Sequence, residues 1–134
     1  MTIKYISFDL DDTFWDVMPT IYKAEELTVA WIKDNYPGTA KLMATENMIE
    51  VRKRIVQEDP SLQFQISKLR KKIFYDSSIL AGYNKEEARD MSETAFNVFI
   101  EGRNNVTLFE GVMDTLESLQ KKPHHSRGIP LLVL

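Results

Sequence analysis

Three closely spaced aspartates stand near the start of the chain: Asp9, Asp11 and Asp12. Along an extended backbone, side chains two residues apart share a face, so Asp9 and Asp11 can point into one site. Two carboxylates in one site repel each other, and they persist there when a cation or a division of roles separates them. The spacing therefore predicts an acidic site that binds a cation, performs acid–base chemistry, or does both.

A hard divalent cation with oxygen ligands suits such a pair of carboxylates. Mg²⁺ keeps several waters and takes one or two carboxylates together with the phosphate oxygens of a substrate. Asp9 and Asp11 are therefore candidates to hold a hard divalent cation such as Mg²⁺.

Acidic residues after a strand have two other common uses. Asp12 and Thr13 have side chains of the kind that cap a helix or close a turn, and this interpretation stays open. A Ca²⁺ loop of the EF-hand type needs Gly at its sixth position and Glu at its twelfth. Counted from Asp9, those positions are Phe14 and Thr20, so the EF-hand pattern is excluded.

The residues before the aspartates predict a strand. Ile3 to Phe8 is short and apolar with little alternation, which is typical of a strand buried on both faces of a parallel sheet. Ligand sites in α/β proteins form outside the carboxyl ends of such strands. We therefore predict that Asp9 lies at the C-terminal end of the first strand, and that Asp11 lies in the loop after it.

From about residue 18 the apolar residues recur at steps of three and four, which predicts helices. Four helices are expected between residues 18 and 103, separated by Pro37-Gly38, Asp59-Pro60 and Gly82. One strand followed by roughly ninety residues of helices is too long for an ordinary crossover. The helices are therefore interpreted as a domain inserted after the first strand.

The last of these helices has a recognisable start. Asn84 and Glu87 have the spacing of a capping box, and an apolar face follows them. Gly102 to Asn105 is predicted as a loop. A further helix is expected where Val112, Leu116 and Leu119 repeat at helical spacing.

Composition excludes several classes of protein. The net charge of −3 gives no electrostatic footprint for nucleic acid, and the absence of cysteine excludes disulfides, thiol nucleophiles and Cys-ligated zinc. No run approaches the roughly 18–20 apolar residues of a membrane span, and the N-terminus does not have a signal-peptide pattern. We expect a cytoplasmic protein whose partner is a small molecule rather than nucleic acid or a membrane. Nothing in the sequence predicts an oligomeric state.

The segment Phe8-Asp9-Leu10-Asp11-Asp12-Thr13, at the end of an N-terminal apolar strand, resembles motif I of the haloacid dehalogenase-like hydrolases. The helical insert is similar to the helical cap of that family, and Leu108 to Val112 resembles the segment that re-enters the core. Glu110 stands where the family usually has proline. The resemblance covers residues 1 to about 122 and implies an α/β fold, a Rossmann-like core with an inserted cap.

The resemblance implies three regions. Residues 1–17 would be the first core strand and the nucleophile loop, residues 18–103 the helical cap, and residues 104–134 an incomplete return to the core. The tail after Lys122 departs from the family pattern, and we expect that it is truncated or out of frame.

The same resemblance assigns roles to the acidic pair. Asp9 would be the nucleophile that forms an aspartyl-phosphate, and Asp11 would be the general acid and base. Mg²⁺ would bind a carboxylate oxygen of Asp9 and the main-chain carbonyl of Asp11. An Asp two residues after the nucleophile marks the phosphatases and phosphomutases of this family, whereas its dehalogenases lack it.

The implied substrate is a small phosphate ester. The motif and the cap that follows it are most similar to phosphatases of flavin mononucleotide or of ribityl-phosphate precursors of riboflavin. Trp15 is interpreted as a hinge or core residue, with stacking on a flavin-like ring as the alternative.

The family also uses a phosphate-binding Ser or Thr, a Lys and a later acidic pair, and the sequence after Lys122 shows none of them in the expected pattern. We therefore expect little or no phosphatase turnover from the chain as written. Two alternatives stay open: an inactive fragment of such a phosphatase, and a small helical binding domain with no phosphatase ancestry.

Overall fold

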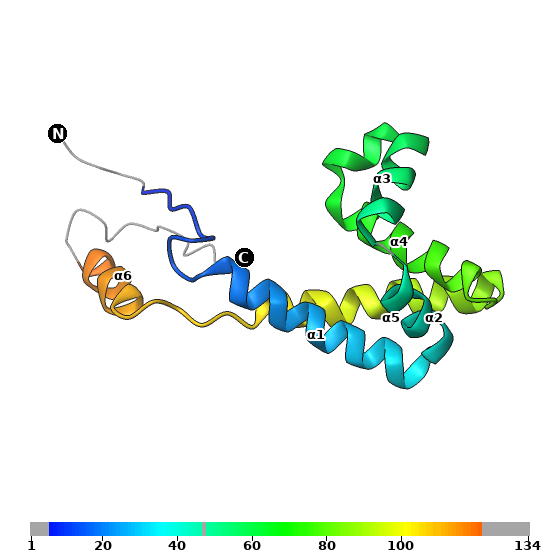
Figure 1. Ribbon diagram of the computed structural model, residues 1–134. Helices are drawn as coiled ribbons and strands as arrows, with labels where there is room; N and C mark the ends of the chain where they lie inside the picture. Colours follow the sequence, from blue (N-terminus) through cyan, green and yellow to red (C-terminus); the bar gives the residue numbers. More distant parts are fainter. Residues whose placement is uncertain (1–5, 47, 122–134) are drawn as a thin grey trace. The chain divides into compact units, whose positions relative to one another are not determined.

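The computed structural model describes residues 6–46 and 48–121. These residues form two units, one from residues 6–20 and 106–121 and the other from residues 21–105. We call the first the N-terminal loop unit and the second the helical unit. The helices are shown in Figure 1: α1 (Val17–Asn35), α2 (Pro37–Thr45), α3 (Met48–Glu58), the 3-10 helix η1 (Pro60–Phe64), α4 (Ile66–Leu80), α5 (Lys85–Asn104) and α6 (Val112–Gln120).

The boundaries of α4 and α5 come from local sequence. Gly82 follows α4 with a φ of +96°, a conformation that glycine adopts without steric cost. Asn84 then caps α5, because its side-chain oxygen accepts hydrogen bonds from the backbone N–H groups of Glu86 and Glu87. The Glu87 carboxylate accepts the backbone N–H of Asn84 in return, so the predicted capping box is confirmed.

The helical unit has two small hydrophobic clusters, and α4 contributes to both. The first contains buried Ile32, Phe74, Met91 and Ala95. The second joins α3, η1 and α4, and it contains buried Val51, Ile55, Leu62 and Leu69. Many of the apolar residues that gave the helical spacing in the sequence therefore face the interior of this unit, although Ile66 and Leu80 at the two ends of α4 are exposed.

Gly102 allows α1 and α5 to approach closely. A Cβ atom at this position would lie 2.9 Å from Cα of Ala24, which is closer than real Cβ contacts. Ala24 is fully buried, so the two helices meet at a pair of small residues. Any larger side chain at residue 102 would force these backbones apart.

The structure departs from the predicted helices at two places. The helix expected to stop at Pro37-Gly38 does end there, at Asn35, but Pro37 opens a further helix, α2, so the described residues of this region form five α-helices rather than the four expected. Proline suits the first helical position, because its missing N–H has no acceptor there and its φ is already helical. The predicted loop at Gly102 to Asn105 is also wrong, since α5 continues to Asn104. The remaining predicted helices are confirmed.

The predicted first strand is not present among the described residues. Residues 1–5 lie outside them, and residues 6–10 have no regular secondary structure. A parallel strand exists only where a neighbouring strand pairs with it, and the described part of the chain contains isolated β-bridges but no strand. The expectation that Asp9 ends a strand is therefore not met by this part of the chain, although Asp9 does lie outside any helix. Within the described residues, no helix is long and apolar enough to span a membrane.

Candidate active site

The three aspartates lie in a tight turn between residues 9 and 16. The backbone carbonyl of Leu10 accepts hydrogen bonds from the N–H groups of Thr13 and Phe14, at 3.1 and 2.9 Å. The Asp12 N–H donates to the carbonyl of Trp15 at 2.8 Å. Asp12 has a φ of +60°, in the left-handed region that Asp tolerates better than most residues. These bonds fold the chain back on itself between Asp11 and Trp15.

Asp12 and Asp16 hold the start of α1. The Asp12 carboxylate accepts the backbone N–H of Val17 at 3.0 Å, and the Asp16 carboxylate accepts that of Met18 at 3.2 Å. The first N–H groups of a helix have no partner inside it, and a negative charge near them is favourable. The capping interpretation that the sequence left open for Asp12 is therefore confirmed.

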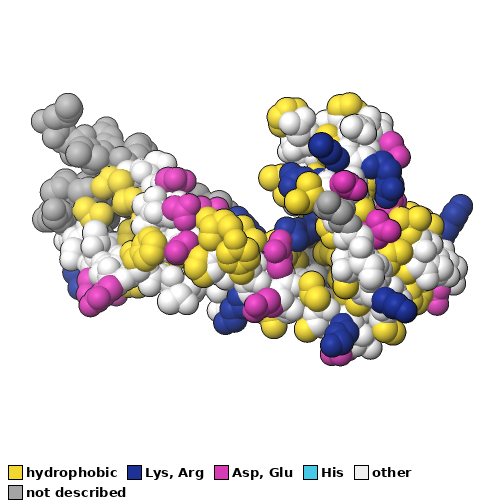
Figure 2. Space-filling view, viewed as in Figure 1, with side chains coloured by type: hydrophobic (Ala, Val, Ile, Leu, Met, Phe, Trp, Pro, Cys, Tyr) yellow, Lys and Arg dark blue, Asp and Glu magenta, His cyan; other side chains and the backbone are white. Residues whose placement is uncertain are grey.

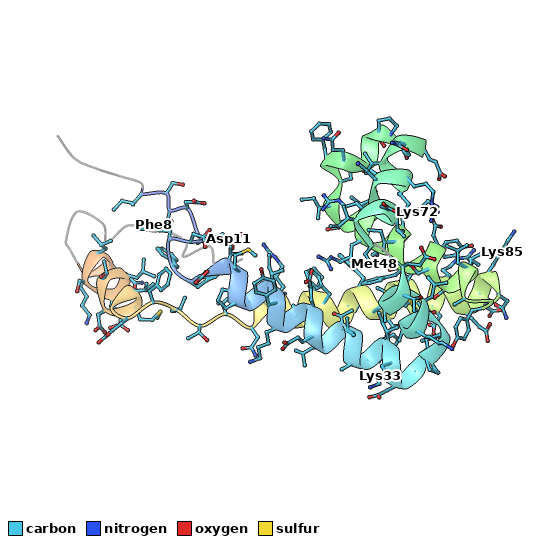
Figure 3. All side chains as sticks on the ribbon, viewed as in Figure 1. Phe8, Asp11, Lys33, Met48, Lys72 and Lys85 are labelled. Atoms are coloured by element: carbon cyan, nitrogen blue, oxygen red, sulfur yellow. The ribbon has the colours of Figure 1, made fainter. Side chains whose placement is uncertain are left out.

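Asp9 and Asp11 do not take part in that cap. Asp9 is exposed, and its Oδ1 accepts the backbone N–H of Leu10 at 3.1 Å. Asp11 is half-buried, and its Oδ1 accepts a hydrogen bond of 3.1 Å from the indole Nε1 of Trp15. Figure 3 labels Asp11 on the loop before α1, with Phe8 earlier on the same strand-free segment.

Two residues before α6, Leu108 and Phe109, form backbone contacts with the aspartate turn. The N–H of Phe109 donates to the carbonyl of Phe14 at 2.8 Å, and Leu108 forms a β-bridge with Trp15. The rings of Phe8 and Phe14 also pack against each other, with centroids 5.4 Å apart. Residues about 90 positions apart in the sequence are thus brought together at the aspartate turn.

The donor atoms at the turn are those that Mg²⁺ prefers, namely carboxylate and main-chain oxygens. No group of three or more His, Asp or Glu side chains is close enough to hold a metal ion within the described ranges. Asp9 and Asp11 both carry oxygen donors of this kind. His124, His125 and Ser126 lie outside the described residues.

Basic residues on α4 are engaged in ion pairs on the surface of the helical unit. Arg70, Lys71 and Lys72 pair with Glu25, Glu93 and Asp76 at 3.3, 2.6 and 2.7 Å. Figure 2 shows the cationic and anionic side chains interspersed over the visible face of these helices. Exposed pairs of this kind contribute roughly 0–1 kcal/mol each, so they describe a solvated surface rather than a site.

Sequence reasoning did not find the contact between Trp15 and Asp11. The positions four apart would face each other on a helix, but residues 11 to 15 form a turn. Their contact depends on the positive φ of Asp12, and an Asp followed by Thr gives only a weak signal of that conformation.

The chain is similar to a curated relative and to a solved structure, whereas no family model matches it. The chain is 26% identical over 120 residues to the 5-amino-6-(5-phospho-D-ribitylamino)uracil phosphatase of Escherichia coli. It is also similar to a crystal structure of a 2-haloacid dehalogenase from Pseudomonas syringae pv. Tomato, with 36% sequence identity and a TM-score of 0.76.

Each match covers 90% of this chain, but the chain spans about half the length of either relative: 50% of the phosphatase and 52% of the dehalogenase. The resemblance to haloacid dehalogenase-like hydrolases that the aspartate motif predicted is confirmed. Both relatives are named as enzymes, which supports an enzymatic rather than a purely structural origin for the motif.

Proposed function

We propose that this chain, a relative of the haloacid dehalogenase-like hydrolases, carries the nucleophile and the general acid of a Mg²⁺-dependent phosphomonoester hydrolase. The observation that carries the proposal is that the four aspartates of this turn have two different kinds of contact. Asp12 and Asp16 cap α1, whereas the Asp9 carboxylate is exposed and the Asp11 carboxylate is held by Trp15. The last two residues are the pair whose chemistry the motif predicts.

In the proposed reaction, a carboxylate oxygen of Asp9 attacks phosphorus, and the bond from phosphorus to the leaving oxygen breaks. Asp11 donates its proton to that oxygen, so the product leaves as an alcohol. Asp11, now a carboxylate, then takes a proton from the water that attacks the aspartyl-phosphate and releases inorganic phosphate. Asp9 and Asp11 would hold Mg²⁺, which when bound neutralises charge between the carboxylate and the phosphate.

The presence of Asp11 favours phosphate ester hydrolysis over dehalogenation as the proposed reaction. The family resemblance places a general acid at this position in phosphatases, and a dehalogenase has no leaving alkoxide that needs a proton. The Escherichia coli relative is named for a ribityl phosphate substrate. We therefore propose a small phosphorylated metabolite as substrate, with flavin mononucleotide and ribityl-phosphate precursors of riboflavin as the first compounds to test.

The two units suggest how such a site would be organised. We propose that the N-terminal loop unit belongs to the catalytic core and that residues 18–103 act as its helical cap. The predicted bounds differ from the observed division at residues 21 and 105 by three residues at the start and two at the end, and these positions lie in α1 and around the last residues of α5.

This proposal is tested by a single-turnover assay of phosphate release, which can detect a slow reaction. The purified chain would be kept in excess over p-nitrophenyl phosphate or flavin mononucleotide, with and without Mg²⁺, because we expect turnover to be slow. Phosphate release that requires Mg²⁺ and is lost in Asp9→Asn supports the proposal. Halide release from a 2-haloacid without phosphate release from any ester would favour dehalogenase chemistry and contradict it.

A further inference from the structure

We propose that Trp15 is a positioning residue for Asp11, and that its indole N–H selects the carboxylate oxygen that carries the catalytic proton. This inference rests on the proposed function, because the selection matters only if Asp11 acts as a general acid. The contact itself is a property of the turn. It can therefore be tested whether or not the chain hydrolyses a phosphate ester.

The indole has one hydrogen bond, and backbone contacts on both sides of Trp15 support it. Its Nε1 lies 3.1 Å from Oδ1 of Asp11, and the side chain is half-buried. The backbone carbonyl of Trp15 accepts the N–H of Asp12 at 2.8 Å, which closes the turn next to the contact. Leu108 forms a β-bridge with Trp15 from the other chain segment of this unit. Because the backbone is fixed on both sides, the ring approaches Asp11 from a defined direction.

The chemistry of the indole makes the contact directional. An indole N–H can only donate a hydrogen bond, so Oδ1 of Asp11 must act as the acceptor. When Asp11 is protonated, its hydrogen therefore resides on Oδ2. In the transfer step the Oδ2–H bond breaks, the proton moves to the leaving oxygen of the ester, and Asp11 becomes a carboxylate. Trp15 does not exchange a proton, and its bond to Oδ1 remains in both states.

The contact favours the hinge or core interpretation of Trp15 over the stacking one. The N–H edge of the ring is directed at a carboxylate of the same turn, and the side chain is half-buried. The proposed role acts through Asp11 and requires no contact between the ring and the substrate.

The contact can be tested by the indole N–H signals in a proton–nitrogen correlation spectrum of the full chain. The sequence contains two tryptophans, so Trp31→Phe assigns the remaining signal to Trp15. We expect Asp11→Asn to move the Trp15 signal upfield, since a neutral amide is a weaker acceptor than a carboxylate. Asp9→Asn is the matched control and should leave the signal in place. An unchanged signal in Asp11→Asn would overturn the inference.

The role in the reaction is tested by Trp15→Phe, which keeps an aromatic ring and removes the donor. With the chain in excess over substrate, we expect the maximal single-turnover rate of phosphate release to fall about tenfold, out of the roughly 10²–10⁴-fold that a positioned general acid supplies, while the half-saturating chain concentration stays unchanged. Esters of poor leaving alcohols should lose more than p-nitrophenyl phosphate, because they need the proton more. Trp31→Phe, in the helical unit, removes an indole elsewhere and should retain the parent rate.

The two proposals fail in different ways. If Asp9→Asn abolishes hydrolysis while Trp15→Phe leaves the single-turnover rate and its leaving-group dependence unchanged, the role of Trp15 is wrong and the proposed function stands. If Asp9→Asn hydrolyses esters as fast as the parent chain, the proposed function is wrong, whatever the indole spectrum shows.

Discussion

The indole Nε1 of Trp15 donates a hydrogen bond to Oδ1 of Asp11 across a turn, over a distance of 3.1 Å. This contact joins a residue of the aspartate motif to the residue that Leu108 pairs with in the other segment of the N-terminal loop unit. The conformation of the motif is therefore set by residues far apart in the sequence as well as by its own turn. Substitutions in the turn, in the helical unit and at the reacting carboxylate should therefore affect different measured properties, namely amide exchange, the free energy of unfolding and phosphoryl transfer.

Removal of the Asp12 carboxylate should loosen the start of α1. Asp12 accepts the N–H of Val17 and also adopts a positive φ. Asp12→Ala loses the cap and strains the turn, so we expect a cost of about 0.5–2 kcal/mol and faster amide hydrogen exchange at Val17. Asp12→Asn keeps an accepting oxygen and tolerates the same φ, so it should exchange nearly as slowly as the parent. Equal exchange in Asp12→Ala and the parent would contradict this role.

Two adjacent serines in α4 should respond in opposite directions to the same substitution. Ser78 and Thr39 are both fully buried, and their hydroxyl oxygens lie 3.0 Å apart in a hydrogen bond. Ser78→Ala would leave the Thr39 hydroxyl without this partner and should destabilise the chain by about 1–3 kcal/mol in urea unfolding.

The Ser77 hydroxyl is also buried, but the described residues provide no hydrogen-bond partner for it. Ser77→Ala removes an unsatisfied polar group, so the free energy of unfolding should rise by about 1 kcal/mol. Loss of stability in Ser77→Ala as large as in Ser78→Ala would show that this hydroxyl does have a partner.

Gly102→Ala tests which of two effects decides the packing of α1 against α5. Helix propensity alone would favour alanine by about 1 kcal/mol. The new Cβ would lie 2.9 Å from backbone Cα of Ala24, and overpacking of this kind costs about 1–3 kcal/mol. We expect net destabilisation in urea unfolding. Gly82→Ala is the matched control, with strain from its positive φ but no atom within 4 Å of the new Cβ. A Gly102→Ala chain that is more stable than the parent would refute the close approach.

Tyr36 should make the stability of the helical unit sensitive to alkaline pH. Burial raises the pKa of Tyr36 above its ordinary value of 10.0, as do its hydrogen bond to the Asp90 carboxylate and the nearby charge of Asp90. A raised folded-state pKa gives stability that is fully present below the unfolded pKa and is lost as pH rises through the folded value.

The decline should therefore appear above about pH 10 and be smaller in Tyr36→Phe, as measured by urea unfolding at a series of pH values. The comparison between the two chains removes the contribution of the other tyrosines and of the lysines. Parallel pH profiles for the parent and Tyr36→Phe would mean that this tyrosine titrates alike in the folded and unfolded states.

Local patterns predicted the helices well, because their causes lie within a few residues. The capping box at Asn84 and the break at Gly82 each require only neighbouring side chains and backbone conformations. The failure to predict the helix that begins at Pro37 also has a local cause. Proline stops one helix and starts another by the same absence of an N–H, and the sequence alone did not distinguish the two.

Features that depend on distant partners were predicted less well. A strand that ends at Asp9 requires a neighbouring strand, and the described residues contain none. The contact of Trp15 with Asp11 requires the left-handed conformation of Asp12 and the pairing of Trp15 with Leu108. The sequence identified Asp9 and Asp11 as the residues of interest and left a capping role open for Asp12. The structure assigns that role to Asp12, whose carboxylate accepts the backbone N–H of Val17.

The central claim is that Asp9 is the nucleophile, and phosphoryl capture on this residue tests it most directly. The full chain would be incubated with Mg²⁺ and acetyl phosphate, a donor that needs little help from a general acid, and its intact mass would be measured. We predict a mass increase of one phosphoryl group that peptide mapping locates on Asp9 and that Asp9→Asn abolishes. Asp11→Asn should accumulate more of it, because water attack loses its base. No adduct on the parent chain, or an adduct that persists in Asp9→Asn, would contradict the account.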